Sequence, residues 1–251
     1  MLFAGASFGL LVAAAVPAQQ STGANPALPD KLVVGDFSGA PPGSLPEDWK
    51  ALIFRDIKSH TRYSLVADPQ YGQVVRAEAA ASASGLVHKV SLDPHEWPIL
   101  QWRWKIDRLV AKADPTRKDG DDYPARIYVS FAYDPARVAW YERPLYAAAK
   151  LFYGEYPPQS GLNYIFDNKS PVGTIVPNAF TGRVRMIVVD SGEAHVGQWQ
   201  SYQRNIVEDY RKAFGEDAPA ISGVAIMTDT DNTGESATAW YANITLHRAA
   251  P

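Results

Sequence analysis

Alternation of apolar and polar residues recurs in short runs along most of this chain. The run LQWRWKI at 100–106 places Leu, Trp, Trp and Ile at every second position, with Arg103 and Lys105 between them. The run at 125–133 alternates in the same way and places Arg126 and Tyr128 among the polar positions. A period of two sends successive side chains to opposite faces of a strand. These runs therefore predict strands with one buried face and one polar face.

Similar runs predict strands over most of the remaining sequence, and Gly, Pro, Asp or Asn bounds most of them. Two stretches look helical instead: 136–153, which Pro144 interrupts, and 207–214, which ends at Gly215. About eleven short strands with few helices predict an all-β fold, an antiparallel two-sheet β-sandwich of jelly-roll type with one or two short inserted helices. The predicted strands are 32–37, 49–54, 63–67, 74–79, 85–92, 100–106, 125–133, 162–166, 184–189, 198–206 and two closing runs that flank the loop 228–235.

Composition narrows the class of protein. A chain of 251 residues, 46% hydrophobic and 20% charged, is long enough for one large β domain, and we expect a single domain over 31–251. The net charge of −3 and the scattered Lys and Arg residues argue against nucleic acid as a partner. The 7 Trp, 13 Tyr and 9 Phe residues suit a strand-rich core, and they are also common on sugar-binding surfaces.

The N-terminal segment resembles an export signal. Residues 2–16 form an uncharged apolar run, and Val16-Pro17-Ala18 offers small residues for signal peptidase, so we expect a signal peptide over 1–18 and a linker over 19–30. The positively charged start of such signals is missing, and a buried or disordered helix is the alternative. The chain has no cysteine. We expect a periplasmic or secreted location and no transmembrane segment in the mature chain.

The polar positions of several predicted strands suggest a ligand-binding face. If these strands are neighbours, Arg103, Lys105, Arg126, Tyr128 and Arg185 share one sheet face. Arginine offers planar, bidentate hydrogen bonding, which suits a polyol or a carboxylated ligand. The alternative is an ordinary solvated sheet on which these arginines pair with nearby carboxylates.

Two loop segments add polar side chains. Asp121 and Asp122 lie close to Arg126 in sequence, which favours an ion-paired structural corner over a catalytic dyad. In the extended segment 161–168, Asn163 and Asp167 share one face and are candidate ligand-binding residues, although they can equally cap a turn.

The loop 228–235 is rich in oxygen ligands. It predicts a calcium site made from Asp229, Asp231, Asn232 and Glu235, with a hydrogen-bonded turn as the alternative. An EF-hand is excluded, because Thr233 occupies its fifth position and Trp240 its twelfth. The sequence contains no cysteine nucleophile or glycine-rich phosphate loop.

Several strings together resemble the bacterial family of domain of unknown function 3047, over about residues 36–246. That resemblance implies an exported protein with a jelly-roll sandwich, and it implies no catalytic residue. A looser likeness links the closing strand to carbohydrate-binding modules. The strings are HTRYSLV (60–66), ASASGLVHKV (81–90), LQWRWKID (100–107), KDGDDYPARIYVSF (118–131), YGEYPP (153–158), LNYIFDN (162–168), RMIVVDSG (185–192) and MTDTDNTGESATAWY (227–241).

Two functions remain open at this point. The first is an exported sandwich that binds a glycan, or another polyol or anionic small ligand, on a polar sheet face without catalysis. The alternative is a polysaccharide-active enzyme on the same fold. It would be a hydrolase that uses two of the loop carboxylates 5–9.5 Å apart, or a lyase that uses Tyr128 with Arg and Lys.

Overall fold

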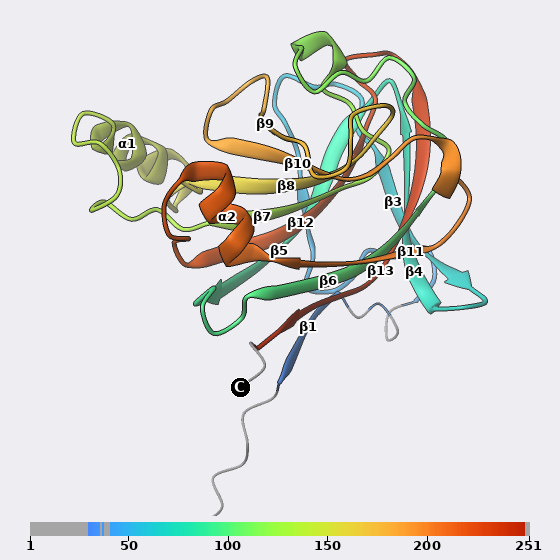
Figure 1. The fold of residues 1–251 in the computed structure, drawn as a ribbon, viewed down its shortest axis with the longest axis horizontal. Helices are drawn as coiled ribbons and strands as arrows, with labels where there is room; N and C mark the ends of the chain where they lie inside the picture. Colours follow the sequence, from blue (N-terminus) through green and yellow to red (C-terminus); the bar gives the residue numbers. More distant parts are fainter. Residues whose placement is uncertain (1–29, 36, 38–40, 249–251) are drawn as a thin grey trace, which may run out of the picture.

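Two β-sheets pack face to face in the computed structural model, which describes residues 30–35, 37 and 41–248 (Figure 1). Sheet A has the order β11-β6-β13-β4-β3, with β1 paired to β13, and sheet B has the order β2-β5-β12-β7-β8-β10-β9. The predicted all-β two-sheet sandwich is confirmed. All pairs are antiparallel except β8 and β10, which run parallel.

The elements agree closely with the predicted runs. Sheet A consists of β1 (Lys31–Gly35), β3 (Arg62–Asp68), β4 (Gly72–Ala80), β6 (Ile99–Ile106), β11 (Gln200–Asn205) and β13 (Ser236–His247). Sheet B consists of β2 (Lys50–Leu52), β5 (Ala83–Leu92), β7 (Arg126–Phe131), β8 (Ser160–Asp167), β9 (Ile175–Pro177), β10 (Val184–Ser191) and β12 (Ile221–Asp229). The helices are α1 (Arg143–Tyr153), α2 (Ile206–Phe214) and the short 3-10 turns η1 (Lys118–Gly120) and η2 (Glu193–His195).

Local sequence explains where the helices begin and end. Helix α1 begins at Arg143 rather than at 136, because Pro144 fits the first helical turn, where its missing N–H would have no intrahelical partner. Helix α2 begins after Asn205, whose side chain accepts hydrogen bonds from the N–H groups of Val207 and Glu208. It ends at Gly215, which has a positive φ of 78°. Figure 1 shows α1 projecting from the side of the sandwich.

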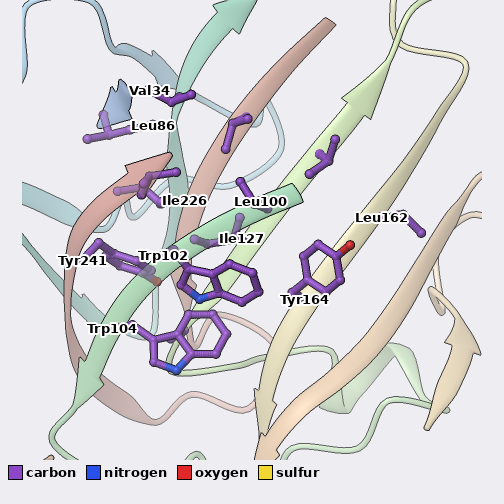
Figure 2. Packing of buried hydrophobic residues seen from close by; sticks show 14 of the residues in the cluster. Val34, Leu86, Leu100, Trp102, Trp104, Ile127, Leu162, Tyr164, Ile226 and Tyr241 are labelled. Carbon is purple, nitrogen blue, oxygen red and sulfur yellow. The ribbon is translucent and has the colours of Figure 1, made fainter. Parts of the chain in front are cut away.

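The core lies between the sheets and is rich in aromatic rings (Figure 2). Trp102 and Trp104 of β6 both point inward, as their alternation predicts, and the Trp102 ring lies 5.3 Å from the ring of Tyr164 in sheet B. Tyr241 of β13 also crosses the core. Its hydroxyl donates to the carbonyl oxygen of Met227 at 2.6 Å, which ties sheet A to the backbone of β12.

The register of sheet B determines which side chains leave its outer face. Tyr128 pairs with Asn163 on one side and with Ala225 on the other, so these three residues share the outer face. Met227 pairs with Arg126 on the same face. Leu162 and Val129, one position away, are fully buried in the core.

The signal peptide predicted over 1–18 and all but the last residue of the 19–30 linker lie outside the described residues. Among the residues that the structure does describe, no helix is long and apolar enough to cross a membrane.

Candidate functional site

A groove crosses the outer face of sheet B. It consists of two adjoining cavities of about 470 and 380 Å³, both within the usual size range of ligand pockets. The two cavities form one groove because the same residues border both of them: Phe54, Tyr128, Thr181, Val184 and Met227. Strands β7 and β12 supply the floor, and the irregular segments 53–57 and 178–183 supply residues on either side.

One end of this groove, here called the acidic end, is built around Arg126. Its side chain is 1% exposed, and its five N–H donors all have acceptors. Nε donates to Asp229 at 2.7 Å, and Nη1 donates to Asp121 at 3.3 Å and to the Tyr128 hydroxyl at 3.1 Å. Nη2 donates to the second Asp229 oxygen and to the carbonyl oxygen of Asp121. Arg126 therefore fixes the floor of the groove and has no free donor for a ligand.

The charge of Arg126 is maintained by its partners. Burial alone would lower the pKa of Arg126, but the carboxylates of Asp229 and Asp121, together with Tyr128, outweigh burial and raise that pKa above its ordinary value. The Tyr123 ring lies under the guanidinium, 4.4 Å from Cζ to the ring centroid. The buried ion pair is thus complete within the protein.

Two further carboxylates, Asp122 and Asp231, lie at the acidic end. Asp122 accepts hydrogen bonds from the backbone N–H of Thr233 at 2.6 Å and from the Asn232 side chain at 3.1 Å. Partial burial, followed by the nearby Asp122 carboxylate, raises the pKa of Asp231 above its ordinary value. Asp231 lines the groove, so its carboxylate is available to a ligand.

The remaining polar groups of the acidic end come from amides and a phenol. Asn178 donates to Asp121 at 2.7 Å, and Asn232 lies beside it in the lining. Burial raises the pKa of Tyr128 to about 12, so its phenol is neutral at physiological pH. The Tyr128 oxygen accepts from Arg126, which leaves the phenol proton for a ligand.

The other end of the groove, here called the apolar end, has a different lining. Its side chains are chiefly aliphatic: Leu52, Val87, Val184, Ala225 and Met227, with Pro158 nearby. Phe54 borders this end as well as the acidic end. The groove therefore changes in chemistry along its length, from carboxylates and amides to alkyl groups.

Sheet A carries a separate cavity of about 340 Å³ on its outer face. Its lining is polar and includes Lys31, Arg103 and His247. Ligand sites usually combine apolar walls with a few fixed polar groups. The groove on sheet B has that combination and the sheet A cavity does not, so we take the groove as the candidate site.

A family model described as a protein of unknown function, DUF3047, matches residues 47–245. The chain belongs to this family. No curated protein matches this DUF3047 chain.

Solved structures with a similar outline are distant from this DUF3047 chain. One is the family 11 carbohydrate-binding module of the cellulase Lic26A-Cel5E of Clostridium thermocellum, with 11% identity and a TM-score of 0.45, covering 87% of this chain and 95% of that chain. Another is the family 30 carbohydrate-binding module of a cellulosomal cellulase of the same organism, with 9% identity and a TM-score of 0.42, covering 88% and 99%. At this level of similarity, neither structure supports an inference about the ligand.

The strands expected to be neighbours lie in different sheets, so the expectation that Arg103, Lys105, Arg126, Tyr128 and Arg185 share one sheet face is wrong. The alternation within each strand is correct, but Arg103 and Lys105 belong to sheet A, whereas Arg126 and Tyr128 belong to sheet B. Their outer faces lie on opposite sides of the sandwich. Alternation separates inside from outside for each strand, but it carries no information about which sheet a strand joins.

Arg185 also departs from the expectation. It pairs with Leu162, so it lies on the inner side of sheet B, where its Cζ is 4.9 Å from the Phe214 ring centroid. Met186 and Val188 face outward instead and pack in a second hydrophobic cluster with Val110, Ala113 and Tyr123. The segment that carries Val110, Ala113 and Tyr123 thus covers this part of the outer face of sheet B. In β10 the apolar residues therefore face outward and Arg185 faces inward, the reverse of what alternation suggests.

Asn163 and Asp167 lie on the same outer face as Tyr128, but neither lines the groove. Both are fully buried. Asp167 accepts a hydrogen bond from the backbone N–H of Ser170 at 2.8 Å. Neither amide atom of Asn163 has a hydrogen-bond partner in the described structure.

One of the predicted calcium ligands, Glu235, lies apart from the aspartates in the structure. Asp122, Asp229 and Asp231 form the carboxylate group in which one oxygen of each lies within 4.8 Å of the others. Glu235 lies elsewhere and accepts hydrogen bonds from the backbone N–H groups of Ala111 and Lys112. Calcium at this loop stays a prediction, with Asp122 in place of Glu235.

Sequence patterns gave no signal for several groove residues. Asn178 and Phe180 come from an irregular segment, which has no periodicity to indicate what its side chains face. Phe54 falls within the predicted strand 49–54, but β2 ends at Leu52, so alternation does not place Phe54 either. The proximity of Asp121 and Arg126 in sequence did predict an ion pair, which the structure confirms, whereas Asp122 accepts from Asn232 and Thr233 instead.

Proposed function

We propose that the groove of sheet B binds an uncharged glycan or other polyol and performs no catalysis. The acidic end supports this proposal, because it places hydrogen-bonding groups beside aromatic rings. Carboxylates accept from sugar hydroxyls, amides both donate and accept, and rings pack against the apolar face of a sugar. These groups are Asp121, Asp231, Asn178, Asn232 and Tyr128, with Phe54 and Phe180 beside them.

The state of Arg126 favours an uncharged ligand over an anionic one. All five donors of Arg126 are bound within the protein, so the guanidinium cannot pair with a ligand carboxylate. The carboxylates of Asp121 and Asp231 line the same end and would repel an anion.

The ionisable groups of the groove fit binding without catalysis better than they fit an enzymatic reaction. A lyase needs a phenol that ionises readily, whereas burial raises the pKa of Tyr128 to about 12. A hydrolase needs two carboxyl groups about 5–9.5 Å apart across a cleft. Asp122, Asp229 and Asp231 are instead gathered in one group, and both Asp122 and Asp229 are held by N–H donors. Asp121, the other carboxylate of the lining, is held by Arg126 and Asn178.

The proposal includes an exported location, periplasmic or secreted. The apolar run at 2–16, with small residues at 16–18, and the absence of cysteine support it. Detection of the mature chain in the periplasmic or culture fraction, with its N-terminus at residue 19, is the corresponding test.

Binding to a glycan array, followed by calorimetry with the best ligand, tests the function. Asp231→Ala and Phe180→Ala should each weaken binding, the latter by roughly twofold to tenfold for a lost aromatic contact of about 0.5–1.5 kcal/mol. Arg103→Ala on sheet A is the matched control and should bind like the wild type. Loss of binding in Arg103→Ala with normal binding in the two groove variants would refute the proposal.

A further inference from the structure

The apolar end of the groove is poorly suited to a second sugar. Its lining is chiefly aliphatic, and its polar side chains Ser130, Ser160 and Arg183 already have hydrogen-bond partners within the protein. A sugar hydroxyl that loses water there without gaining a new hydrogen bond weakens binding. Alkyl groups on a ligand would instead gain free energy against the side chains of Val87, Ala225 and Met227.

The two ends of the groove are continuous, so a single ligand can occupy both. Val184 and Met227 border both cavities and form an apolar path from the acidic end to the apolar end. Tyr128 lies on the same path and presents its hydroxyl towards Arg126. Neighbouring side chains of β7, β10 and β12 therefore produce the change from polar to apolar lining along the groove.

Further exposed apolar side chains lie on and beside helix α1, which contacts the apolar end through Arg183. Arg183 lines that end and binds helix α1, because its Nη2 donates to Glu142 at 2.7 Å and its Cζ lies 5.0 Å from the Tyr146 ring centroid. The α1 region exposes large apolar side chains to solvent: Trp140 (77% exposed), Tyr141, Leu145 and Leu151. Exposed apolar patches of this kind are typical of surfaces that meet an apolar partner.

We propose that the ligand of this groove is an amphiphile, with a hydroxylated headgroup at the acidic end and one alkyl chain in the apolar end. This inference rests on the proposed polyol binding for the headgroup. The alkyl chain adds a second source of affinity, independent of the headgroup. A glycolipid, in which a sugar is joined to an alkyl chain, has this chemistry, and an anionic amphiphile would place its charge against Asp121 and Asp231.

A chain-length series of alkyl glucosides tests the inference directly. Glucose, hexyl glucoside and octyl glucoside are titrated into the full chain by calorimetry, each below its critical micelle concentration. Each buried methylene contributes a free energy that corresponds to about a threefold to fourfold gain in affinity. Octyl glucoside should therefore bind about tenfold tighter than hexyl glucoside, and glucose should bind weakest.

Two substitutions locate the alkyl chain of the ligand within the groove. Ala225→Phe fills the apolar end, and Val87→Asn places an amide there at a partly exposed position where misfolding is less of a concern. Both variants should lose the dependence of affinity on chain length while they keep the affinity for the free sugar. Ala194→Phe adds the same side chain at an exposed alanine that lines neither cavity, and its series should match the wild type.

The outcomes separate this inference from the proposed function. Equal affinity for hexyl and octyl glucoside, or an unchanged series in both groove variants, would overturn the amphiphile while polyol binding stood. Octyl dimethylamine oxide, which carries no sugar, provides the other comparison. Equal binding of this compound and octyl glucoside, unaffected by Asp231→Ala, would confirm the alkyl site and refute the polyol. Failure of every alkyl glucoside to bind would overturn the amphiphile.

Discussion

The outer faces of the two sheets come from the same alternation of residues but have different surfaces. On sheet A, charged side chains remain near solvent: Lys105 lies over the rings of Trp199 and Trp240, at 5.1 and 4.6 Å, and Arg62 pairs with Glu78. On sheet B, loops cover much of the face and bury Arg126 together with its carboxylates. In this fold, a polar position of an amphipathic strand thus becomes part of the candidate site where other segments fold over it.

The largest expected effect distinguishes the two faces by stability. Arg126→Ala leaves Asp229 buried without its partner, so we expect the free energy of unfolding to fall by about 3–5 kcal/mol. Arg103→Ala removes an arginine above the Tyr71 ring at 5.1 Å on sheet A, and it should cost no more than about 1 kcal/mol. Urea unfolding of both variants measures the difference. Equal losses would mean that the two arginines have equivalent environments, against this account.

A second prediction uses pH, because the pKa of Asp68 in sheet A is lowered whereas the pKa of Asp231 beside sheet B is raised. Burial alone would raise the pKa of Asp68 at the end of β3, but hydrogen bonds from Gln70, Trp199 and Tyr71 outweigh it and lower that pKa. Its contribution to stability is therefore present above the ordinary aspartate pKa and is lost as pH falls through the lowered folded value. Asp68→Asn should destabilise the fold at pH 7, by about 1 kcal/mol, and much less in acid.

The contribution of Asp231 to stability should have the reverse dependence on pH. Because its folded pKa is raised, its contribution is present below the ordinary pKa and is lost as pH rises through the folded value. Asp231→Asn should therefore stabilise the fold at pH 7 and have little effect in strong acid. Urea unfolding of both asparagine variants at neutral and acidic pH tests the pair. The same pH profile for the two variants would contradict the assigned environments.

The smallest expected effect concerns calcium at the loop beside the acidic end. For a dissociation constant of about 0.1–1 mM, millimolar calcium should raise the melting temperature by roughly 1–5 °C relative to chelator. Asp231→Ala should abolish the shift. Glu235→Gln should retain it, because Glu235 lies outside the carboxylate group. No shift in the wild type would leave a hydrogen-bonded turn as the role of this loop.

The sequence predicted the sandwich well and the site only in part, for one physical reason. Alternation is a local property, so the inward positions of Trp102, Trp104, Ile127 and Val129 could be read correctly from it. Strand pairing is a long-range property, and nothing in the runs separated β6 from β7 into different sheets. Arg103 and Arg126 were therefore placed together although they lie on opposite faces.

Coverage by loops is the second feature that local patterns could not supply. Met186 and Val188 are outward residues in β10, yet they are buried because Val110, Ala113 and Tyr123 pack over them. Similarly, Phe180 reaches the groove from a segment without periodicity, and Phe54 does so from beyond the end of β2, although the predicted strand runs to 54. The short separation of Asp121 and Arg126 is the exception, because there the sequence did predict the ion pair that the structure contains.

The central claim is that the ligand binds the outer face of sheet B. Titration of the isotope-labelled chain with octyl glucoside, followed by amide chemical shifts in NMR spectra, tests it most directly. We expect the largest shifts at Thr181, Val184 and Met227, which line both ends of the groove. Shifts concentrated instead at Gln101, Ser201 and His247, which line the cavity on sheet A, would contradict it.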